Sequence, residues 1–223
     1  MDKPTRTLVI VGDSKTLEKI ASDLKNKPDV REIYKHQRFT NALVAIFYDI
    51  RKAEAVYKDI KSTNTVVYYS ISKYEVPQEI DKCDESRNQG TVYITLKNNR
   101  NVNEKEFMKH ISSFGEIKEI KLTSGLIKCV EFFDTRSASK IREALNNKSY
   151  GNCSVSVRNV WDLNSKTRTE LLNRVEQEIQ KIEVPDVKKR KITNKKTENI
   201  PFGDLFDEFI VENLDKIILK IKR

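Results

Sequence analysis

The sequence is poor in the residues that build disulfide, metal and catalytic sites. Among 223 residues there are only 3 Cys and 2 His. The cysteines, Cys83, Cys129 and Cys153, are odd in number, far apart and without a Cys-x-x-Cys pair, so they support neither a disulfide framework nor a zinc site. His36 and His110 are isolated, and no Ser-His-Asp, paired-carboxylate or phosphate-loop pattern can be assembled. We therefore expect reduced thiols, no catalytic residues, no metal and no cofactor.

Glycine, proline and long apolar runs are also scarce. With 6 Gly and 5 Pro the chain is neither collagen-like nor proline-rich. No apolar run approaches the roughly 18 residues of a membrane span. The first residues, MDKPTRTLVIVGD, hold too short an apolar stretch for a signal peptide. These absences predict an intracellular protein with no membrane partner and no small-molecule substrate.

Positive charge, in contrast, is in excess. The chain carries 42 Lys and Arg against 33 Asp and Glu, a formal net charge of +9. Such a balance favours a polyanionic partner, although charge alone does not specify which one. Six of the basic residues and two acidic ones lie within 184–201.

Two motifs recur in the same order. FYDIRKA at 47–53 returns as FFDTRSA at 132–138, and TLVIVGD from Thr7 returns as TVYITLK from Thr91. The offsets are 85 and 84 residues, so one inserted residue explains the difference. We interpret this pattern as a duplicated domain.

Each copy shows the order strand, helix, strand, strand, helix, strand. In the second copy Asn103 begins a helix, with Glu106 completing a capping box and Val102 and Phe107 forming a hydrophobic staple. The order predicts an α+β class with two ferredoxin-like β-α-β-β-α-β domains, each a four-stranded antiparallel sheet with both helices on one face, followed by a helical C-terminal tail. The expected segments are a first domain at 1–75, a linker at 76–89, a second domain at 90–160, a helix at 161–183, a basic linker at 184–201 and an amphipathic helix at 202–223.

This order, with FGEIKEIKL after the first helix of the second copy and an aromatic-ended third strand, resembles the RNA recognition motif (RRM) in two copies. Within that superfamily, FYDIRKAEA and FFDTRSASK are similar to the F-Y-D-x-R-x-A signature of the tandem RRMs in the Mei-two-like proteins, regulators of meiosis. The resemblance implies a nuclear or nucleocytoplasmic ribonucleoprotein component acting in post-transcriptional regulation. It also implies that bases stack on aromatic side chains of the first and third strands.

Only one of these stacking positions is aromatic here. By alignment the first copy has Val9, Ala42 and Val44 there, and the second has Tyr93, Ile127 and Cys129. We expect Tyr93 to stack on a base and Arg158 to contact a phosphate or stack; alternatively, Tyr93 is a half-exposed strand residue and Arg158 a solvated charge. Tyr68 and Tyr69 are adjacent, so one of them must face the open side of the first sheet and is a further candidate for RNA contact.

The alternation of side chains leaves the open face of the first sheet apolar. Such a face needs a cover. We expect it to be a protein-interaction surface, covered by helix 202–221 or by a helix from a partner. The residues concerned are Val9, Val11, Ala42, Val44 and Ile46.

The repeated Asp-x-Arg pairs, Asp49 with Arg51 and Asp134 with Arg136, have a structural explanation. Each aspartate lies where the helix after the third strand begins, so it is expected to cap that helix. This reading is favoured over a functional one.

The C-terminal third contains two apolar patterns and one basic tract. Residues 165–183 carry Leu171, Leu172, Val175, Ile179 and Ile182 along one side, which predicts a helix that packs on something, with Trp161 placed to anchor its start. The tract Lys188, Lys189, Arg190 and Lys191 is either a nuclear address, a phosphate contact or a solvated linker. The last segment is the most amphipathic, and its expected protein-interaction residues are Phe202, Leu205, Phe206, Phe209, Ile210 and Ile217.

Taken together, the pattern predicts a non-catalytic protein that binds single-stranded RNA through the second copy and basic segments, and binds a protein through apolar surfaces. The alternative is an interaction adaptor or ribonucleoprotein assembly factor whose degenerate RRMs do not bind RNA. The scarcity of stacking aromatics favours the alternative, whereas Tyr93 and the basic segments favour RNA binding.

Overall fold

The computed structural model describes residues 3–63, 65–87, 89–97, 102–124 and 127–182. The first repeat contains β1 (Thr7–Val11), α1 (Ser14–Lys25), β2 (Val30–Lys35), β3 (Ala42–Phe47), α2 (Ile50–Lys61) and β4 (Val66–Ser70). A 3-10 turn, η1 (Glu85–Arg87), precedes the second repeat. The second repeat contains β5 (Thr91–Lys97), α3 (Glu104–Ser112), β6 (Ile117–Ser124), β7 (Ile127–Phe132), α4 (Thr135–Leu145), β8 (Lys148–Tyr150) and β9 (Cys153–Val160), and α5 (Ser165–Lys181) follows.

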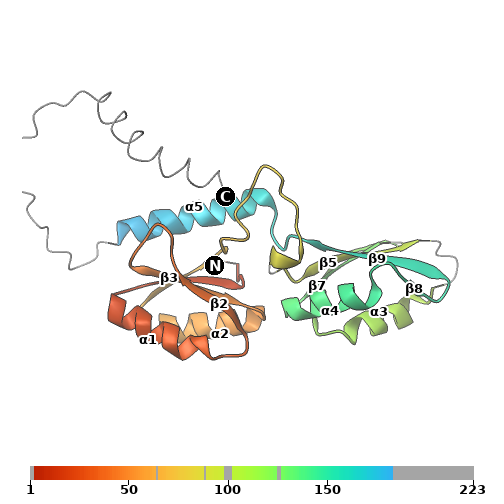
Figure 1. The fold of residues 1–223 in the computed structure, drawn as a ribbon, viewed down its shortest axis with the longest axis horizontal. Helices are drawn as coiled ribbons and strands as arrows, with labels where there is room; N and C mark the ends of the chain where they lie inside the picture. The colour runs from red at the N-terminus through yellow and green to blue at the C-terminus, as the bar shows by residue number, and fades with distance from the viewer. Residues whose placement is uncertain (1–2, 64, 88, 98–101, 125–126, 183–223) are drawn as a thin grey trace, which may run out of the picture. The chain divides into compact units, whose positions relative to one another are not determined.

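Both repeats have the predicted ferredoxin-like α+β fold. The first sheet is antiparallel with strand order β2-β3-β1-β4, and α1 and α2 lie on one of its faces (Figure 1). Its core lies between that face and the helices and includes Leu8, Ile10, Leu43 and Phe47. These are the alternate residues of β1 and β3, as a period of two requires.

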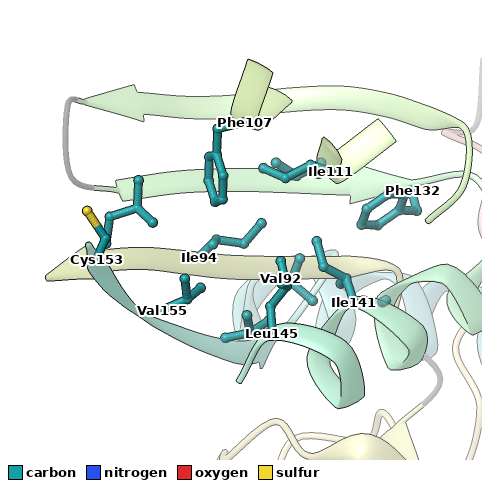
Figure 2. Close-up of a cluster of buried hydrophobic side chains, with 13 residues drawn as sticks. Val92, Ile94, Phe107, Ile111, Phe132, Ile141, Leu145, Cys153 and Val155 are labelled. Atoms are coloured by element: carbon teal, nitrogen blue, oxygen red, sulfur yellow. The ribbon is translucent and has the colours of Figure 1, made fainter. Parts of the chain in front are cut away.

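The second sheet has one strand more than the first. Its order is β6-β7-β5-β9-β8, because the short β8 pairs with the beginning of β9. Figure 2 shows the core between this sheet and α3 and α4, where Phe107 and Ile111 of α3 meet Phe132 of β7. The strand β8 has only three residues and no alternating apolar pattern, which is why the sequence did not predict it.

Short polar side chains define where the helices begin. Asp13, Asn103 and Asn164 accept hydrogen bonds from the free backbone N–H groups of α1, α3 and α5. Asp49 and Asp134 do the same for α2 and α4, with the N–H groups of Arg51 and Arg136 each 2.8 Å from the carboxylate. The predicted capping role of both aspartates is confirmed.

Helix α5 covers the face of the first sheet opposite to α1 and α2 (Figure 1). Val175 and Ile179 of α5 are each 2% exposed and pack on the sheet. Five buried residues of the sheet form the other half of this cluster: Val9, Val11, Ala42, Val44 and Ile46. The predicted need for a cover is confirmed, but the expected occupant was wrong: the helix is α5, whereas 202–221 lies outside the described residues.

The segment between the repeats is held in place by polar contacts. The guanidinium of Arg168, on α5, is fully buried and donates to the carbonyl of Glu75 and to the carboxylate of Asp81. It also lies over the ring of Trp161, 3.8 Å from the ring centroid, and the Trp161 indole donates to the carbonyl of Asp81. Trp161 therefore anchors the start of α5, as expected, and binds this helix to the connecting segment.

A second buried ion pair joins the two repeats. Arg6, just before β1, pairs with Asp162, just after β9, and donates to the carbonyl of Phe132 at 2.7 Å. Asp162 also accepts from the N–H of Gly90 and from the hydroxyl of Thr91. Because buried charges need partners, these bonds fix the ends of four strands, β1, β5, β7 and β9, together.

Candidate nucleic-acid interface

The open face of the second sheet lies opposite to α3 and α4, and its centre is a row of three side chains. Tyr93 on β5 pairs in register with Cys129 on β7 and with Arg158 on β9. Directly paired residues of an antiparallel sheet point to the same side. The alternation that places Val92 and Ile94 in the core therefore brings this row to the open face.

Tyr93 and Arg158 interact with each other. The guanidinium carbon of Arg158 lies 5.4 Å from the centroid of the Tyr93 ring, within the range of a cation–π contact. Tyr93 is half-buried and Arg158 is exposed. The pair thus presents a flat aromatic surface with a positive charge at its side, which suits a base and the phosphate next to it.

The next row of side chains on the open face, beyond Tyr93 toward the end of β5, carries no charge. Thr95 pairs with Ile127 and with Ser156, so two hydroxyl groups flank Tyr93 on this side. Ile127 is 36% exposed. These side chains leave room above the sheet and offer hydrogen-bonding groups without negative charge.

The row on the other side of Tyr93, toward the start of β5, contains Glu131, which forms ion pairs with two lysines. Glu131, 3% exposed, accepts from the ammonium groups of Lys118 and Lys121 at 2.7 and 2.8 Å. Burial raises the pKa of Glu131, but these hydrogen bonds outweigh burial and leave the pKa below its ordinary value. The carboxylate therefore stays charged but is neutralised locally, so it does not oppose an approaching phosphate.

The first sheet offers no comparable open face. Tyr68 pairs with Val9 and packs against the cluster under α5, whereas Tyr69 pairs with Leu8 and points into the core. Tyr69 is 5% exposed and its ring is stacked on that of Tyr57, and burial raises its pKa to about 12. The expectation that Tyr69 contacts RNA was wrong because its register places it inside. Tyr68 does belong to the face opposite to the helices, but α5 now occupies that face.

The predicted interaction residues of the first sheet are buried by the same helix. Val9, Val11, Val44 and Ile46 are each 3% exposed or less. Their expected role as a surface for a partner is thus corrected: in this structure they form the bed of α5. The other expected residues, Lys188, Lys189, Arg190, Lys191, Phe202, Leu205, Phe206, Phe209, Ile210 and Ile217, lie outside the described residues.

The Asp-x-Arg pairs have a second role that the sequence pattern does not reveal, which is to join the repeats. The N–H of Ile50 donates to the carbonyl of Phe133 at 3.1 Å, and the N–H of Thr135 donates to the carbonyl of Tyr48 at 3.0 Å. Asp49 and Asp134 form the isolated bridge between these bonds. The two copies of one motif therefore pair with each other.

The arginine of each motif also contacts the opposite repeat. Arg51 donates to Glu116 at 2.5 Å and lies 4.3 Å from the ring centroid of Phe133. Arg136 makes the corresponding contacts, to Asp29 at 3.0 Å and to the ring of Tyr48 at 4.8 Å. The hydrogen bonds to Asp49 and Asp134 raise the pKa of Arg51 and Arg136, respectively, above the ordinary value. We call this set the inter-repeat clamp.

Two cysteines, Cys83 and Cys129, lie in surroundings that do not favour thiolates. Burial raises the pKa of Cys83 to about 12, and it also raises the pKa of Cys129. Within the described ranges, no group of three or more His, Cys, Asp or Glu side chains is arranged to hold a metal ion. No helix in the described part of the chain is long and apolar enough to cross a membrane.

Comparisons with known proteins agree with the fold of the second repeat. Residues 92–156 match the sequence model of the RNA recognition motif family, so this repeat contains an RRM domain. No curated protein matches the sequence.

Several solved structures show low-level similarity. The RNA15 RRM is 16% identical with a TM-score of 0.30, over 36% of this chain and 97% of that chain. The Sxl-lethal protein in complex with RNA is 14% identical with a TM-score of 0.27, over 69% and 98% of the respective chains. The Rna15 RRM with bound GU RNA is 18% identical with a TM-score of 0.28, over 41% and 97%. Similarity at this level carries no inference about the ligands of this chain.

Proposed function

We propose that the chain is a non-catalytic RNA-binding protein that holds single-stranded RNA on the open face of the second repeat. The observation that carries the proposal is the pair formed by Tyr93 and Arg158 on a sheet face of an RRM domain that none of the described helices covers. The first repeat, whose corresponding face is filled by α5, serves as a structural platform.

In this proposal the flat ring of Tyr93 carries one base. The guanidinium of Arg158, 5.4 Å from the ring centroid, contacts the adjoining phosphate, and the hydroxyls of Thr95 and Ser156 bond to sugar or base atoms. Since a single aromatic residue supplies the stacking, we expect weak binding with little base preference.

Replacing Tyr93 tests this proposal. Tyr93→Ala should weaken binding of an unstructured RNA oligomer about 5- to 150-fold, since stacking on one aromatic ring is worth about 1–3 kcal/mol per base. Tyr93→Phe keeps the ring and should retain most of the affinity. Fluorescence anisotropy at fixed salt measures both. If the Ala and Phe variants bind every RNA as tightly as the parent, Tyr93 is not a stacking residue.

The basic tract of Lys188, Lys189, Arg190 and Lys191 is proposed to add a sequence-independent electrostatic contribution. Each phosphate that a Lys or Arg side chain neutralises releases counterions from the RNA. The affinity therefore falls more steeply with salt concentration when more phosphates are contacted. A chain ending at residue 182 should therefore show a shallower salt dependence than the full chain. The same tract is our proposed basis for a nuclear or nucleocytoplasmic location, which imaging of a fluorescent fusion with and without residues 188–191 would test.

A second candidate function is that of an adaptor that binds protein alone. It is favoured by the nonaromatic residues Ile127 and Cys129 at two of the three stacking positions. The segment Phe202 to Ile217 is proposed as its protein-binding helix, and the likeness to Mei-two-like proteins suggests a role in meiosis for either candidate. Absence of any salt-sensitive RNA binding by the full chain would decide for the adaptor.

A further inference from the structure

A polar groove runs along the outer edge of β9, beside the proposed RNA face. Its volume is about 630 Å³. One wall comes from the segment before β5 and the other from the end of α4 and the turn after it. The polar side chains that line these walls are Lys82, Asp84, Ser86, Arg142, Asn146 and Asn147.

The groove exists because β8 is short and begins only at Lys148. The last pair between β8 and β9 is Lys148 with Val155. Beyond it the backbone N–H of Val157 donates to the side-chain oxygen of Asn146 at 2.9 Å. The edge of β9 from Ser156 onward is thus not covered by β8.

The groove is continuous with the open face of the sheet. Ser156 and Arg158 belong to that face, and both also line the groove. An RNA strand with one base on Tyr93 therefore reaches the groove by passing over Arg158.

The chemistry of the groove suits a nucleotide. Three cationic side chains line the groove, Lys82, Arg142 and Arg158, and two of them, Lys82 and Arg158, are exposed where a phosphate would pass. Asp84 also lines the groove, but its carboxylate accepts from the N–H and the hydroxyl of Ser86 at 2.9 and 2.6 Å. The volume falls within the roughly 300–1,000 Å³ of small-molecule sites, which is enough for one nucleotide.

Asn159 supplies an unused acceptor. Its side-chain oxygen is buried and has no hydrogen-bond partner among the described residues, and Asn159 lines the groove. Buried polar atoms are nearly always hydrogen-bonded, so such an oxygen points to a donor brought by a ligand. The N–H groups of nucleobases are donors of this kind.

We propose that this groove binds the nucleotide next to the one stacked on Tyr93. Lys82 contacts the phosphate, and the side-chain oxygen of Asn159 accepts from the base. The inference rests on the proposed RNA function and adds a subsite to it. A peptide strand is disfavoured as occupant, because strand addition needs free backbone N–H groups and that of Val157 is already bonded to Asn146.

The test compares short and long RNA. Binding of a single uridine nucleotide and of a six-nucleotide oligouridine to the full chain is measured by NMR titration and anisotropy, with Lys82→Gln and Asn159→Ala as variants. Each variant should leave binding of the single nucleotide at Tyr93 unchanged within a factor of two and reduce the affinity gained with six nucleotides by about fivefold or more. Lys140→Gln is the matched control, because Lys140 is an exposed lysine of α4 that does not line the groove.

The outcomes separate the two proposals. If Tyr93→Ala weakens binding but Lys82→Gln and Asn159→Ala behave like Lys140→Gln, the groove is not a subsite and the RNA function stands. If none of the variants changes binding, both proposals fail. Lys82 is exposed, so its replacement reports on the groove even if Asn159→Ala impairs folding. Photo-crosslinking of 4-thiouridine-labelled RNA should also place crosslinks within 82–86 or 146–147, and crosslinks confined to the first repeat would overturn the inference.

Discussion

Gly90 shows how a single residue joins the repeats. A Cβ atom at this position would lie 2.3 Å from a guanidinium nitrogen of Arg6 and 2.8 Å from the carbonyl oxygen of Phe132. Both are fixed, since Arg6 donates to that carbonyl and pairs with Asp162. Gly90→Ala should therefore destabilise the protein by about 1–3 kcal/mol, as overpacking of a close-packed interior does. Urea denaturation measures the loss as a lower midpoint.

Gly12 is the matched control for this substitution. The nearest atoms to a Cβ at Gly12 are 3.8 Å away, an ordinary contact distance. Gly12→Ala should leave the midpoint unchanged or raise it slightly, because alanine restricts the unfolded chain. Equal effects at both positions would show that the close approach of Arg6 to Gly90 does not contribute to stability.

Residue roles could be predicted from the sequence where local rules decide them. Strand alternation correctly assigned Tyr93 and Arg158 to the open face, and capping chemistry correctly assigned Asp49 and Asp134. The register of Tyr68 and Tyr69 was left open because adjacent residues of one type give no pattern. The groove oxygen of Asn159 could not be foreseen, since its burial depends on where β8 begins.

At the scale of elements, the strands and helices of both repeats except the three-residue β8 were predictable from periodicity, whereas the surfaces on which the helices after the second repeat pack were not. Two segments, 165–183 and 202–221, carry apolar residues at helical spacing, and either could in principle cover an apolar sheet. The stronger amphipathic pattern of 202–221 favoured that segment as the cover, whereas α5 is the helix found on the first sheet. The direct path from β9 into α5, with Arg168 fixed between Trp161 and Asp81, favours the nearer helix.

Substitutions in α5 can test whether this helix packs on the first sheet. Ile179→Ala removes a fully packed side chain and should cost about 2–5 kcal/mol, the range for truncating buried Ile or Leu. Partial release of the helix should also increase binding of a hydrophobic dye. Gln177→Ala, at an exposed position of the same helix, should change neither quantity. Similar results for the two variants would contradict the packing of α5 on the sheet.

At the scale of the whole molecule, the repeats are joined through equivalent residues. Tyr48, Asp49 and Arg51 of one repeat correspond to Phe133, Asp134 and Arg136 of the other, and each arginine reaches the residue just before the second strand of the opposite repeat, Asp29 or Glu116. Helix capping by itself accounts for the two aspartates in the motif. No local sequence pattern therefore indicated that the arginines contact the opposite repeat. The one available signal was that the whole motif, including its arginine, occurs twice.

The inter-repeat clamp leads to a prediction about local opening. Arg51 and Arg136 are 46% and 41% exposed, so their ion pairs contribute at most about 1 kcal/mol each after solvent screening. Cation–π contacts at exposed sites add about 0.5–1 kcal/mol. Replacing both arginines by alanine should therefore speed hydrogen exchange at the amides of Ile50 and Thr135 by about tenfold or more, because these N–H groups bond across the repeats.

Hydrogen exchange of amides within α2 and α4 distinguishes loss of the inter-repeat clamp from loss of helix capping. Asp49 and Asp134 still cap α2 and α4 in the double variant, so amides in the middle of these helices should keep their protection. Lys58→Ala, an exposed change on α2, should leave the amides of Ile50 and Thr135 as they are. If the double variant instead loses protection uniformly, the arginines support the fold of each repeat. Unchanged exchange at Ile50 and Thr135 would mean that Arg6 and Asp162, with α5, hold the repeats together without the clamp.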